Sequence, residues 1–268
     1  MSMPLIQSRD NATVKRLARL LDSARERSDT GLVPIEGCHL IRACVESPGF
    51  GTAAITQVLV SEAAMRHPDI AATLPILPAE RVQMVARTVF GRLGEEEGTN
   101  GIVAVISKPP TVAAPSNAGL RLCLDGIQDP GNVGTLIRTA AAAGAASVLL
   151  GRGCADPWSP KSLRAGMGGQ FRVAIEADVE LASWLAQTRG RVIGADANAD
   201  HSAFEIGLLG DVAIVLGSEG QGLSDAVRRE IRERVSIPMA PGIESLNVAA
   251  AGAILCFERV RQARGVAK

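Results

Sequence analysis

The chain has 268 residues, enough for two ordinary domains or one large one, and its 47% hydrophobic content with 28 glycines is typical of a globular α/β protein. Lys and Arg together number 28, and so do Asp and Glu, so the overall charge neither favours nor excludes a polyanionic partner. Aromatic residues make up only 3% and tyrosine is absent, which excludes aromatic stacking on bases as a major binding device and predicts a core of Ala, Val, Leu and Ile.

The cysteines and histidines give no sign of a metal site or a disulfide framework. Five cysteines are scattered without a CxxC spacing, and the three histidines lie far apart. We therefore expect no metal and a reducing, cytoplasmic setting. The N-terminal stretch lacks a basic and then apolar signal pattern, and the longest runs of small apolar residues, around 139–150 and 246–257, are too short to span a bilayer. We expect a soluble protein with no membrane partner.

The first predicted element is an amphipathic helix over residues 11–27. Its apolar residues recur at helical spacing, so one face would pack and the other would be basic. The basic residues assigned to the outer face are Lys15, Arg16, Arg19, Arg25 and Arg27. A solvated surface is the ordinary explanation for such a face, and the alternative is an RNA contact through Lys15, Arg16 and Arg19.

The next stretch alternates short apolar runs with helical periods. The pattern runs through residues 32–47, 54–65, 75–93 and 100–109. It predicts βα units around a parallel or mixed sheet. No catalytic constellation is visible in this part of the chain.

Residues 107–119 contain three prolines and no periodic pattern, which predicts a linker. We therefore place an N-terminal domain at 1–107, the linker at 108–118 and a larger α/β domain at 119–268. For the larger domain the pattern predicts strands at 120–125, 146–150, 171–175, 191–195, 212–217 and 234–238, and helices at about 132–143, 160–167, 178–188, 223–232 and 244–263.

A first polar cluster lies in residues 124–145. A strand ends at Asp125, a Pro-Gly turn follows, and Asn132 is a natural N-cap for the next helix. Helical side chains lean toward the N-terminus, so the guanidinium of Arg138 could reach back near Asn132. It would suit a phosphate or a developing oxyanion there, while the alternative is a surface arginine paired with a carboxylate.

A second cluster, VAIVLGSEGQGLS at 212–224, joins a buried strand to a glycine-rich loop and a helix. Glycines there let the backbone approach a ligand closely. The loop lacks both the GxGxxG spacing of a dinucleotide fingerprint and the Lys-Ser/Thr of a P-loop. These absences argue against an NAD enzyme and a phosphate-cleaving NTPase.

The third cluster, IPMAPGIESLNVAAAGAILCFERV at 237–260, runs from a short strand through a Pro-Gly loop into a long helix of small residues. Ser245 and Asn247 are placed in or beside the first turn of that helix. They could cap the helix, or they could face a ligand at the carboxyl edge of the sheet.

In this order and at these separations, NVGTLIRTA, VLGSEGQGLS and IPMAPGIESLNVAAAGAI resemble the three motifs of the SpoU (TrmH) family of RNA ribose 2′-O-methyltransferases, within the SPOUT superfamily. The resemblance covers essentially all of residues 119–268. It implies an α/β domain with a mostly parallel sheet and a trefoil knot, working as a homodimer with the site near the interface. VPIEGCHLIRACVES resembles the family's frequent N-terminal substrate-binding domain, a small α/β module like those of some ribosomal proteins.

The same resemblance implies a site for S-adenosylmethionine made from the second and third motifs. Its cofactor-binding positions are Leu216, Gly217, Gly220, Ile237, Met239 and Leu246. Its catalytic positions are Asn132, Arg138, Glu219, Ser245 and Asn247, with Arg138 also set against the RNA. One departure is Gly166, which stands where the family commonly has serine and bears on RNA positioning by that segment rather than on methyl transfer.

Methyl transfer to a ribose 2′-hydroxyl needs an in-line approach and removal of the hydroxyl proton, and it needs no metal. Because a guanidinium stays protonated at ordinary pH, we expect Arg138 to stabilise the developing alkoxide while an RNA phosphate or water takes the proton. Arginine as the base is the alternative. By analogy of the N-terminal domain, ribosomal RNA is favoured over transfer RNA. Two other functions stay open, a non-catalytic RNA-binding or ribosome-associated protein of the same fold and, less favoured, a nucleotide-cofactor oxidoreductase.

Overall fold

The computed structural model describes residues 5–91, 93, 101–109 and 119–266, and these divide into two compact units. The first unit holds residues numbered up to 110 together with Trp158–Phe171. The second holds residues from 111 to 157 together with Arg172–Lys268. Most of the expected linker, from residue 110 to 118, lies outside the described residues.

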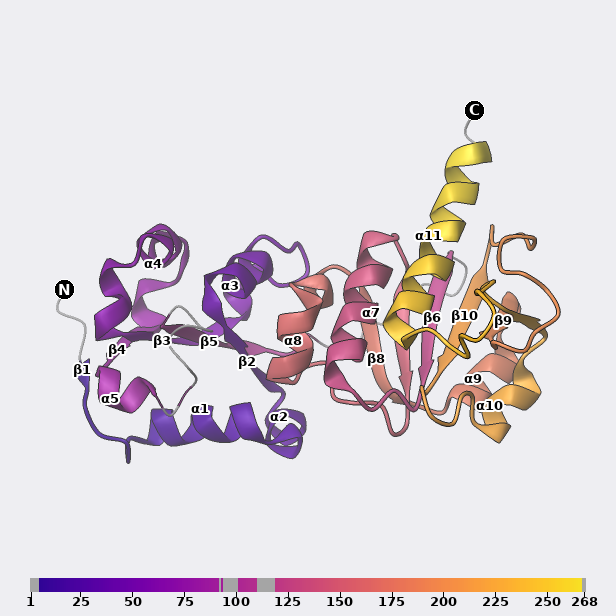
Figure 1. The fold of residues 1–268 in the computed structure, drawn as a ribbon. Helices are drawn as coiled ribbons and strands as arrows, with labels where there is room; N and C mark the ends of the chain where they lie inside the picture. The colour runs from indigo at the N-terminus through magenta and orange to yellow at the C-terminus, as the bar shows by residue number, and fades with distance from the viewer. Residues whose placement is uncertain (1–4, 92, 94–100, 110–118, 267–268) are drawn as a thin grey trace. The chain divides into compact units, whose positions relative to one another are not determined.

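The first unit is built on a five-stranded mixed sheet, as the alternating pattern predicts. Strand order is β1-β4-β3-β5-β2, with β5 antiparallel to both neighbours and the other pairs parallel. Helices α1 and α5 cover one face, and α3 and α4 lie on the other (Figure 1). The strands are β1 (Leu5–Ile6), β2 (Leu32–Glu36), β3 (Ile55–Ser61), β4 (Val82–Val85) and β5 (Ile102–Ser107). The helices are α1 (Ala12–Asp22), α2 (Ala24–Thr30), α3 (Gly37–Val45), α4 (Pro68–Thr73), α5 (Arg87–Phe90) and α8 (Pro160–Gly166), with short 3-10 turns at Thr52–Ala54, Glu62–Arg66, Leu74–Ile76, Ala79–Arg81 and Gly169–Phe171.

The single helix expected over residues 11–27 is wrong in one respect, because it breaks at Ser23. The Ser23 side chain caps α2 by accepting from the N–H of Glu26 at 3.2 Å. Serine favours such N-cap positions over the interior of a helix, so the chain starts a new helix at this residue. Arg27 is also not on the solvated face. Its guanidinium is buried and donates to the carbonyls of Leu20 and Leu21 at 2.6 and 3.2 Å, which satisfies the C-terminal end of α1.

The segment Trp158–Phe171 joins the first unit through aromatic and ionic contacts. The Phe50 ring lies 6.3 Å from that of Trp158 and 5.0 Å from that of Phe171. Arg164 donates to the buried carboxylate of Glu36 at 2.7 Å. Burial raises the pKa of Glu36, and the Arg164 contact opposes that rise.

Within this segment Gly166 has a packing reason that the sequence did not reveal. A Cβ at Gly166 would lie 2.2 Å from the side chain of Gln170, which is buried and donates to the carbonyl of Ser162 at 2.9 Å. Glutamine at position 170 therefore fills the space that a serine at 166 would need.

The second unit is a six-stranded, all-parallel sheet in the order β11-β9-β10-β6-β7-β8, which confirms the expected α/β class with a mostly parallel sheet. Helices α7 and α11 cover one face, and α9 and α10 pack on the other (Figure 1). The strands are β6 (Leu120–Asp125), β7 (Ser147–Gly151), β8 (Ala174–Val179), β9 (Arg191–Ala195), β10 (Val212–Gly217) and β11 (Glu233–Val235). The helices are α7 (Pro130–Ala142), α9 (Leu181–Gln187), α10 (Asp225–Glu230) and α11 (Val248–Val266).

Several predicted boundaries in this unit are wrong. The fifth expected helix start, residue 244, is four residues early, since α11 begins at Val248. Strand β8 begins at Ala174, because residues 169–171 form a 3-10 turn in place of the expected strand. Asn132 is not the N-cap of α7. Asp129 takes that role by accepting from the N–H of Asn132 at 3.0 Å, since proline at position 130 is tolerated in a first helical turn and does not end it.

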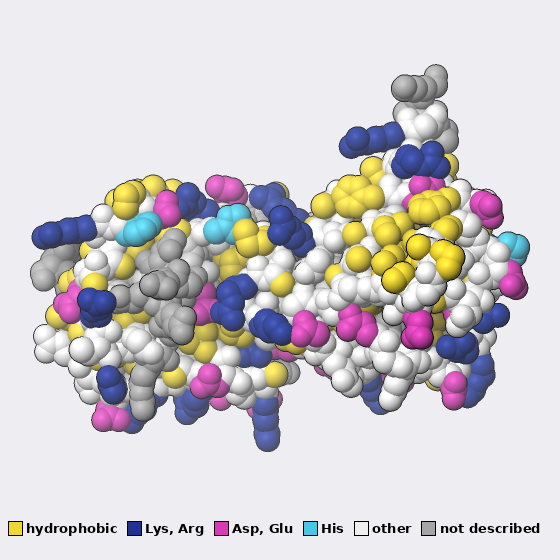
Figure 2. All heavy atoms as spheres, in the orientation of Figure 1, with side chains coloured by type: hydrophobic (Ala, Val, Ile, Leu, Met, Phe, Trp, Pro, Cys, Tyr) yellow, Lys and Arg dark blue, Asp and Glu magenta, His cyan; other side chains and the backbone are white. Residues whose placement is uncertain are grey.

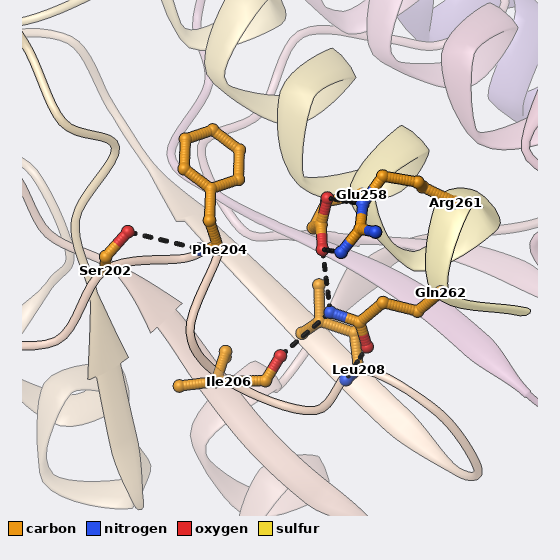
Figure 3. A network of polar contacts seen from close by, with 7 residues as sticks. All are labelled: Ser202, Phe204, Ile206, Leu208, Glu258, Arg261 and Gln262. Atoms are coloured by element: carbon orange, nitrogen blue, oxygen red, sulfur yellow. Dashed lines mark hydrogen bonds and ion pairs between the residues drawn. The ribbon is translucent and has the colours of Figure 1, made fainter. Parts of the chain in front are cut away.

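Small residues bring α11 against α7 and β10. A Cβ at Gly252 would lie 2.3 Å from a methyl carbon of Leu136 and 2.9 Å from one of Leu216. Farther along α11, Gln262 holds the loop that precedes β10, donating to the carbonyl of Ile206 and accepting from the N–H of Leu208 (Figure 3). Helix α11, which begins within the third motif, is therefore held near both of its ends.

Candidate active site

The site lies at the carboxyl edge of the second unit's sheet. From β6 the chain runs to β7 and β8 on one side, while β10, β9 and β11 lie on the other. Connections that leave β6 and β10 therefore diverge, which opens a crevice above these strand ends. Asp125 and Gly217, the last residues of the two strands, are paired in register.

The glycine-rich loop after β10 folds back on itself. Ser218 and Gly222 exchange backbone hydrogen bonds of 3.0 and 2.9 Å. A Cβ at Gly217 would lie 2.2 Å from the carbonyl carbon of Gly222, so only glycine fits there. The Asp125 carboxylate accepts from the N–H of Ser224 at 2.7 Å and ties the end of the loop to β6.

A cavity of about 350 Å³ lies between this loop, the end of β9 and the segment that leads into α11. All six positions assigned to the cofactor line it, namely Leu216, Gly217, Gly220, Ile237, Met239 and Leu246. Ser245 and Glu219, two of the five assigned catalytic positions, line it too. The structure thus gathers two motifs that are separate in sequence around one space.

A hydrogen-bonded network joins all three motifs. One carboxylate oxygen of Glu219, Oε1, accepts from Asn132 Nδ2 at 3.1 Å and from Asn247 Nδ2 at 2.6 Å. Asn247 Nδ2 also lies 3.2 Å from Asn132 Oδ1, and the N–H of Val248 lies 3.4 Å from Glu219 Oε1. Asn132, Glu219 and Asn247, here called the motif triad, therefore hold α7, the glycine-rich loop and α11 together.

Asn247 also caps α11. Its Oδ1 accepts from the N–H groups of Ala249 and Ala250 at 3.0 and 3.3 Å. Of the two roles that the sequence left open for Asn247, helix capping is confirmed by these bonds, and contact with a ligand stays a prediction. Ser245 lies three residues before the start of α11, so it is outside the helix. Its place is in the lining of the first cavity.

Arg138 is exposed on α7, and its side chain makes no hydrogen bond or ion pair with the described residues. No hydrogen bond joins its guanidinium to Asn132, whose side chain bonds to Glu219 and Asn247. The carboxylate-paired arginine that the sequence offered as one alternative is not seen among the described residues, and a role toward a phosphate or a developing oxyanion stays a prediction. An arginine with no described protein partner is available to a polyanion.

A second cavity of about 500 Å³ adjoins the first across the glycine-rich loop. Its lining includes residues 125–129 at and after the end of β6, Asn132 and Gly153, and residues 218–222. Cys154, which follows Gly153 in the chain, donates to the carbonyl of Leu124 and accepts from the N–H of Ile127, both at 3.3 Å. Burial raises the pKa of the Cys154 thiol, which keeps it protonated for that donation.

Sequence reasoning missed two charged residues of the first cavity, Asp196 and Arg228. Asp196 follows β9 directly, at the same carboxyl edge as the assigned residues, and that position was the available signal. The residues assigned to RNA in the first unit, Lys15, Arg16 and Arg19, lie exposed on α1 opposite its buried Val14, Leu17 and Leu20. Lys15 Nζ lies 2.7 Å from Asp10 Oδ1, and Arg19 Nε lies 3.6 Å from Glu26 Oε1.

The first cavity suits a nucleoside-like cofactor that carries charge. Its walls combine aliphatic side chains such as Leu216, Ile237 and Leu246 with backbone exposed by glycines. Its charged residues are Asp196, Glu219 and Arg228, two anions and one cation. Among the described residues no cluster of His, Cys, Asp or Glu could hold a metal ion, and no helix there is long and apolar enough to cross a membrane.

The parallel sheet, the crevice at its switch point and the paired cavities are typical of an α/β enzyme that binds a small cofactor. The family model described as "SpoU rRNA Methylase family" matches residues 119–257. The chain therefore belongs to the SpoU rRNA methylase family, which confirms the prediction from the three motifs.

Relatives match along nearly the whole chain. A 23S rRNA (guanosine(2553)-2′-O)-methyltransferase from Bacillus subtilis is 31% identical, over 95% of this chain and 98% of its own. An uncharacterized tRNA/rRNA methyltransferase from Synechocystis is 33% identical, over 96% and 93%. Among solved structures, the SpoU methyltransferase AviRb from Streptomyces viridochromogenes in complex with AdoMet has a TM-score of 0.82 and 27% identity, covering 94% of this chain and 98% of that one.

Proposed function

We propose that the protein transfers the methyl group of S-adenosylmethionine to a ribose 2′-hydroxyl of ribosomal RNA. The observation that carries the proposal is the gathering of the three motifs, with six assigned cofactor positions around one cavity and the motif triad at its border. The activities for which the relatives are named, 23S rRNA 2′-O-methylation among them, support the same reaction and the ribosomal target.

The first cavity would hold the cofactor, which supplies an electrophilic methyl group on a sulfonium. Leu216, Ile237 and Leu246 would contact its adenine with apolar atoms, and the glycine-rich loop would contact it with backbone. The second cavity shares residues 218–222 with the first, so a nucleotide placed there would lie next to the cofactor. Asn132 and Asn247, oriented by Glu219, would position the reacting ribose.

Arg138 is proposed to stabilise the developing alkoxide, since it is exposed and has no described protein partner. A guanidinium keeps its proton at ordinary pH, so an RNA phosphate or water would accept the hydroxyl proton. Removing one such stabilising group from an enzyme costs about 10²- to 10³-fold in rate.

The test pairs calorimetry with a tritium-transfer assay on ribosomal RNA and on transfer RNA. Arg138→Ala should bind S-adenosylmethionine as the wild type does and lose at least about 100-fold in transfer. Arg229→Ala, at another exposed arginine of the second unit, is the matched control and should retain both properties. Near-normal transfer by Arg138→Ala would remove Arg138 from the mechanism, and a wild type that transfers to neither RNA would indicate a non-catalytic RNA-binding protein.

RNA affinity is proposed to reside in the first unit, on the exposed side of α1. Replacing Lys15, Arg16 and Arg19 together by Gln should weaken RNA binding and flatten its dependence on salt while cofactor binding stays constant. Unchanged RNA affinity would place the binding surface elsewhere. A ribosomal substrate would require the enzyme to work in the compartment where ribosomes are assembled.

The second unit is proposed to form a homodimer. Hydrophobic side chains gather over α11 and the segment before it (Figure 2). The large exposed ones in this unit are Phe204 (50% exposed), Leu209, Ile243 (56%), Leu246 and Phe257 (47%). Since Leu246 also lines the first cavity, a partner on this surface would border the site. Phe257→Glu should shift the protein to monomer in analytical ultracentrifugation, and a wild type that sediments as a monomer would overturn the dimer.

A further inference from the structure

Asp196 is a nearly buried carboxylate at the edge of the cofactor cavity, and no motif accounts for it. Its side chain is 11% exposed. Oδ1 accepts from the N–H of Asn198 at 3.0 Å, while Oδ2 lies 3.2 Å from Arg234 Nη1 and 3.5 Å from Arg228 Nη1. Two arginines from different elements, β11 and α10, thus fix one short side chain.

The sheet order determines which end of the cofactor Asp196 would meet. Strand β10 lies between β9 and β6, and its loop separates the two cavities. The motif triad stands on the β6 side, where Glu219 bonds to Asn132. The reacting nucleotide is proposed on that side, so the methyl group would face it. The adenosine would then occupy the apolar part of the first cavity, which Asp196 lines at the end of β9.

The hydrogen-bonding capacity of Asp196 fits a hydroxyl donor. An ionised carboxylate has about four acceptor sites, and the three contacts with Asn198, Arg228 and Arg234 leave room for another donor. Adenosine offers two such donors in its ribose hydroxyls. An acidic residue after the strand that neighbours a glycine-rich loop serves the same purpose in dinucleotide-binding sheets, where it binds a ribose hydroxyl.

We propose that Asp196, positioned by Arg228 and Arg234, accepts a hydrogen bond from a ribose hydroxyl in the adenosine part of S-adenosylmethionine. The inference rests on the proposed function, since it presumes that this cofactor occupies the first cavity. It makes Asp196 a cofactor-binding residue, with the two arginines as positioning residues.

The test measures binding of S-adenosylhomocysteine and of its 2′-deoxy and 3′-deoxy counterparts by calorimetry, with no RNA present. The wild type should bind at least one deoxy compound about 10- to 100-fold more weakly, as expected for a lost hydrogen bond to a charged group. Asp196→Ala should bind the parent compound more weakly by a similar factor and should no longer distinguish it from that deoxy compound. Asp200→Ala, at an exposed carboxylate of the same segment, should behave as the wild type.

A merely structural role for Asp196 would weaken all three ligands together and leave their ratios unchanged, which would overturn the inference. So would a wild type that binds the parent and both deoxy compounds equally, a result that does not depend on whether Asp196→Ala folds. A wild type that binds no S-adenosylhomocysteine at all would instead overturn the proposed function. Far-UV circular dichroism of each variant confirms that the affinities belong to folded protein.

Discussion

Two different replacements of Asn247 can separate helix capping from assembly of the site, although the one side chain performs both. Its Oδ1 caps α11 through Ala249 and Ala250, and its Nδ2 donates to Glu219 at 2.6 Å. Asn247→Ala removes the cap and the donor. Asn247→Ser keeps an oxygen that can cap the helix but is too short to reach Glu219.

The free energies of unfolding of the two variants should differ by the contribution of the N-cap. An N-cap is worth about 1 kcal/mol, and the exposed bonds to Glu219 and Asn132 add about 1 kcal/mol together. Asn247→Ala should therefore lower the free energy of unfolding by about 2 kcal/mol and Asn247→Ser by about 1 kcal/mol. At roughly 3 °C per kcal/mol for a domain of this size, the melting temperatures should fall by about 6 and 3 °C.

Calorimetric melting and tritium transfer, measured on the same preparations, check both functions of Asn247. Both variants should lose methyl transfer to the same extent, since both leave Asn132 and Glu219 without their third member. A serine variant as active as the wild type would refute the role of the motif triad in the site. Equal melting temperatures for the two variants would refute the cap.

Two further predictions concern the loop and the end of α11. Gly217→Ala should cost about 1–3 kcal/mol and abolish tight cofactor binding in calorimetry, because its Cβ would overlap the Gly222 backbone. Gly220→Ala meets open space and should leave the melting temperature unchanged; equal melting temperatures for the two variants would show that the loop adapts. Hydrogen bonding to Arg261 lowers the pKa of Glu258 from 4.5, so the stability it contributes is present above that value and is lost as pH falls through the lower, folded pKa. The difference in unfolding free energy between wild type and Glu258→Gln, from urea titrations, should thus be widest near neutral pH and should narrow as pH falls below 4.5; a difference that does not vary with pH would contradict this.

Much of the cofactor cavity could be predicted from sequence, because its parts are local signals at strand ends. Strands β6, β9 and β10 begin and end where the apolar runs do, and the glycine-rich loop follows β10 directly. The motif resemblance supplied Ile237 and Leu246, which line the cavity with that loop. A parallel sheet then brings these segments to one edge without further information.

The rest depended on contacts between distant residues. Proline at position 130 looks like a turn, yet Asp129 makes it the first residue of a helix. The partners of Arg27 and Gln170 are backbone carbonyls whose positions follow only from the folded chain. Asp196 had no motif, and its place in the cavity follows from the order of β9 and β10 in the sheet, which apolar runs do not encode.

The packing of Trp158–Phe171 in the first unit means that no single cut divides this polypeptide into two independent proteins. A catalytic fragment starting at residue 119 would carry Trp158 and Phe171 without the Phe50 ring that they pack against, and Arg164 without Glu36. Such a fragment should be prone to aggregate when produced alone. Co-expressed with a fragment ending near residue 110, it should instead reassemble, since each piece supplies part of the same hydrophobic core. The enzyme is thus suited to split-protein complementation and poorly suited to simple domain truncation.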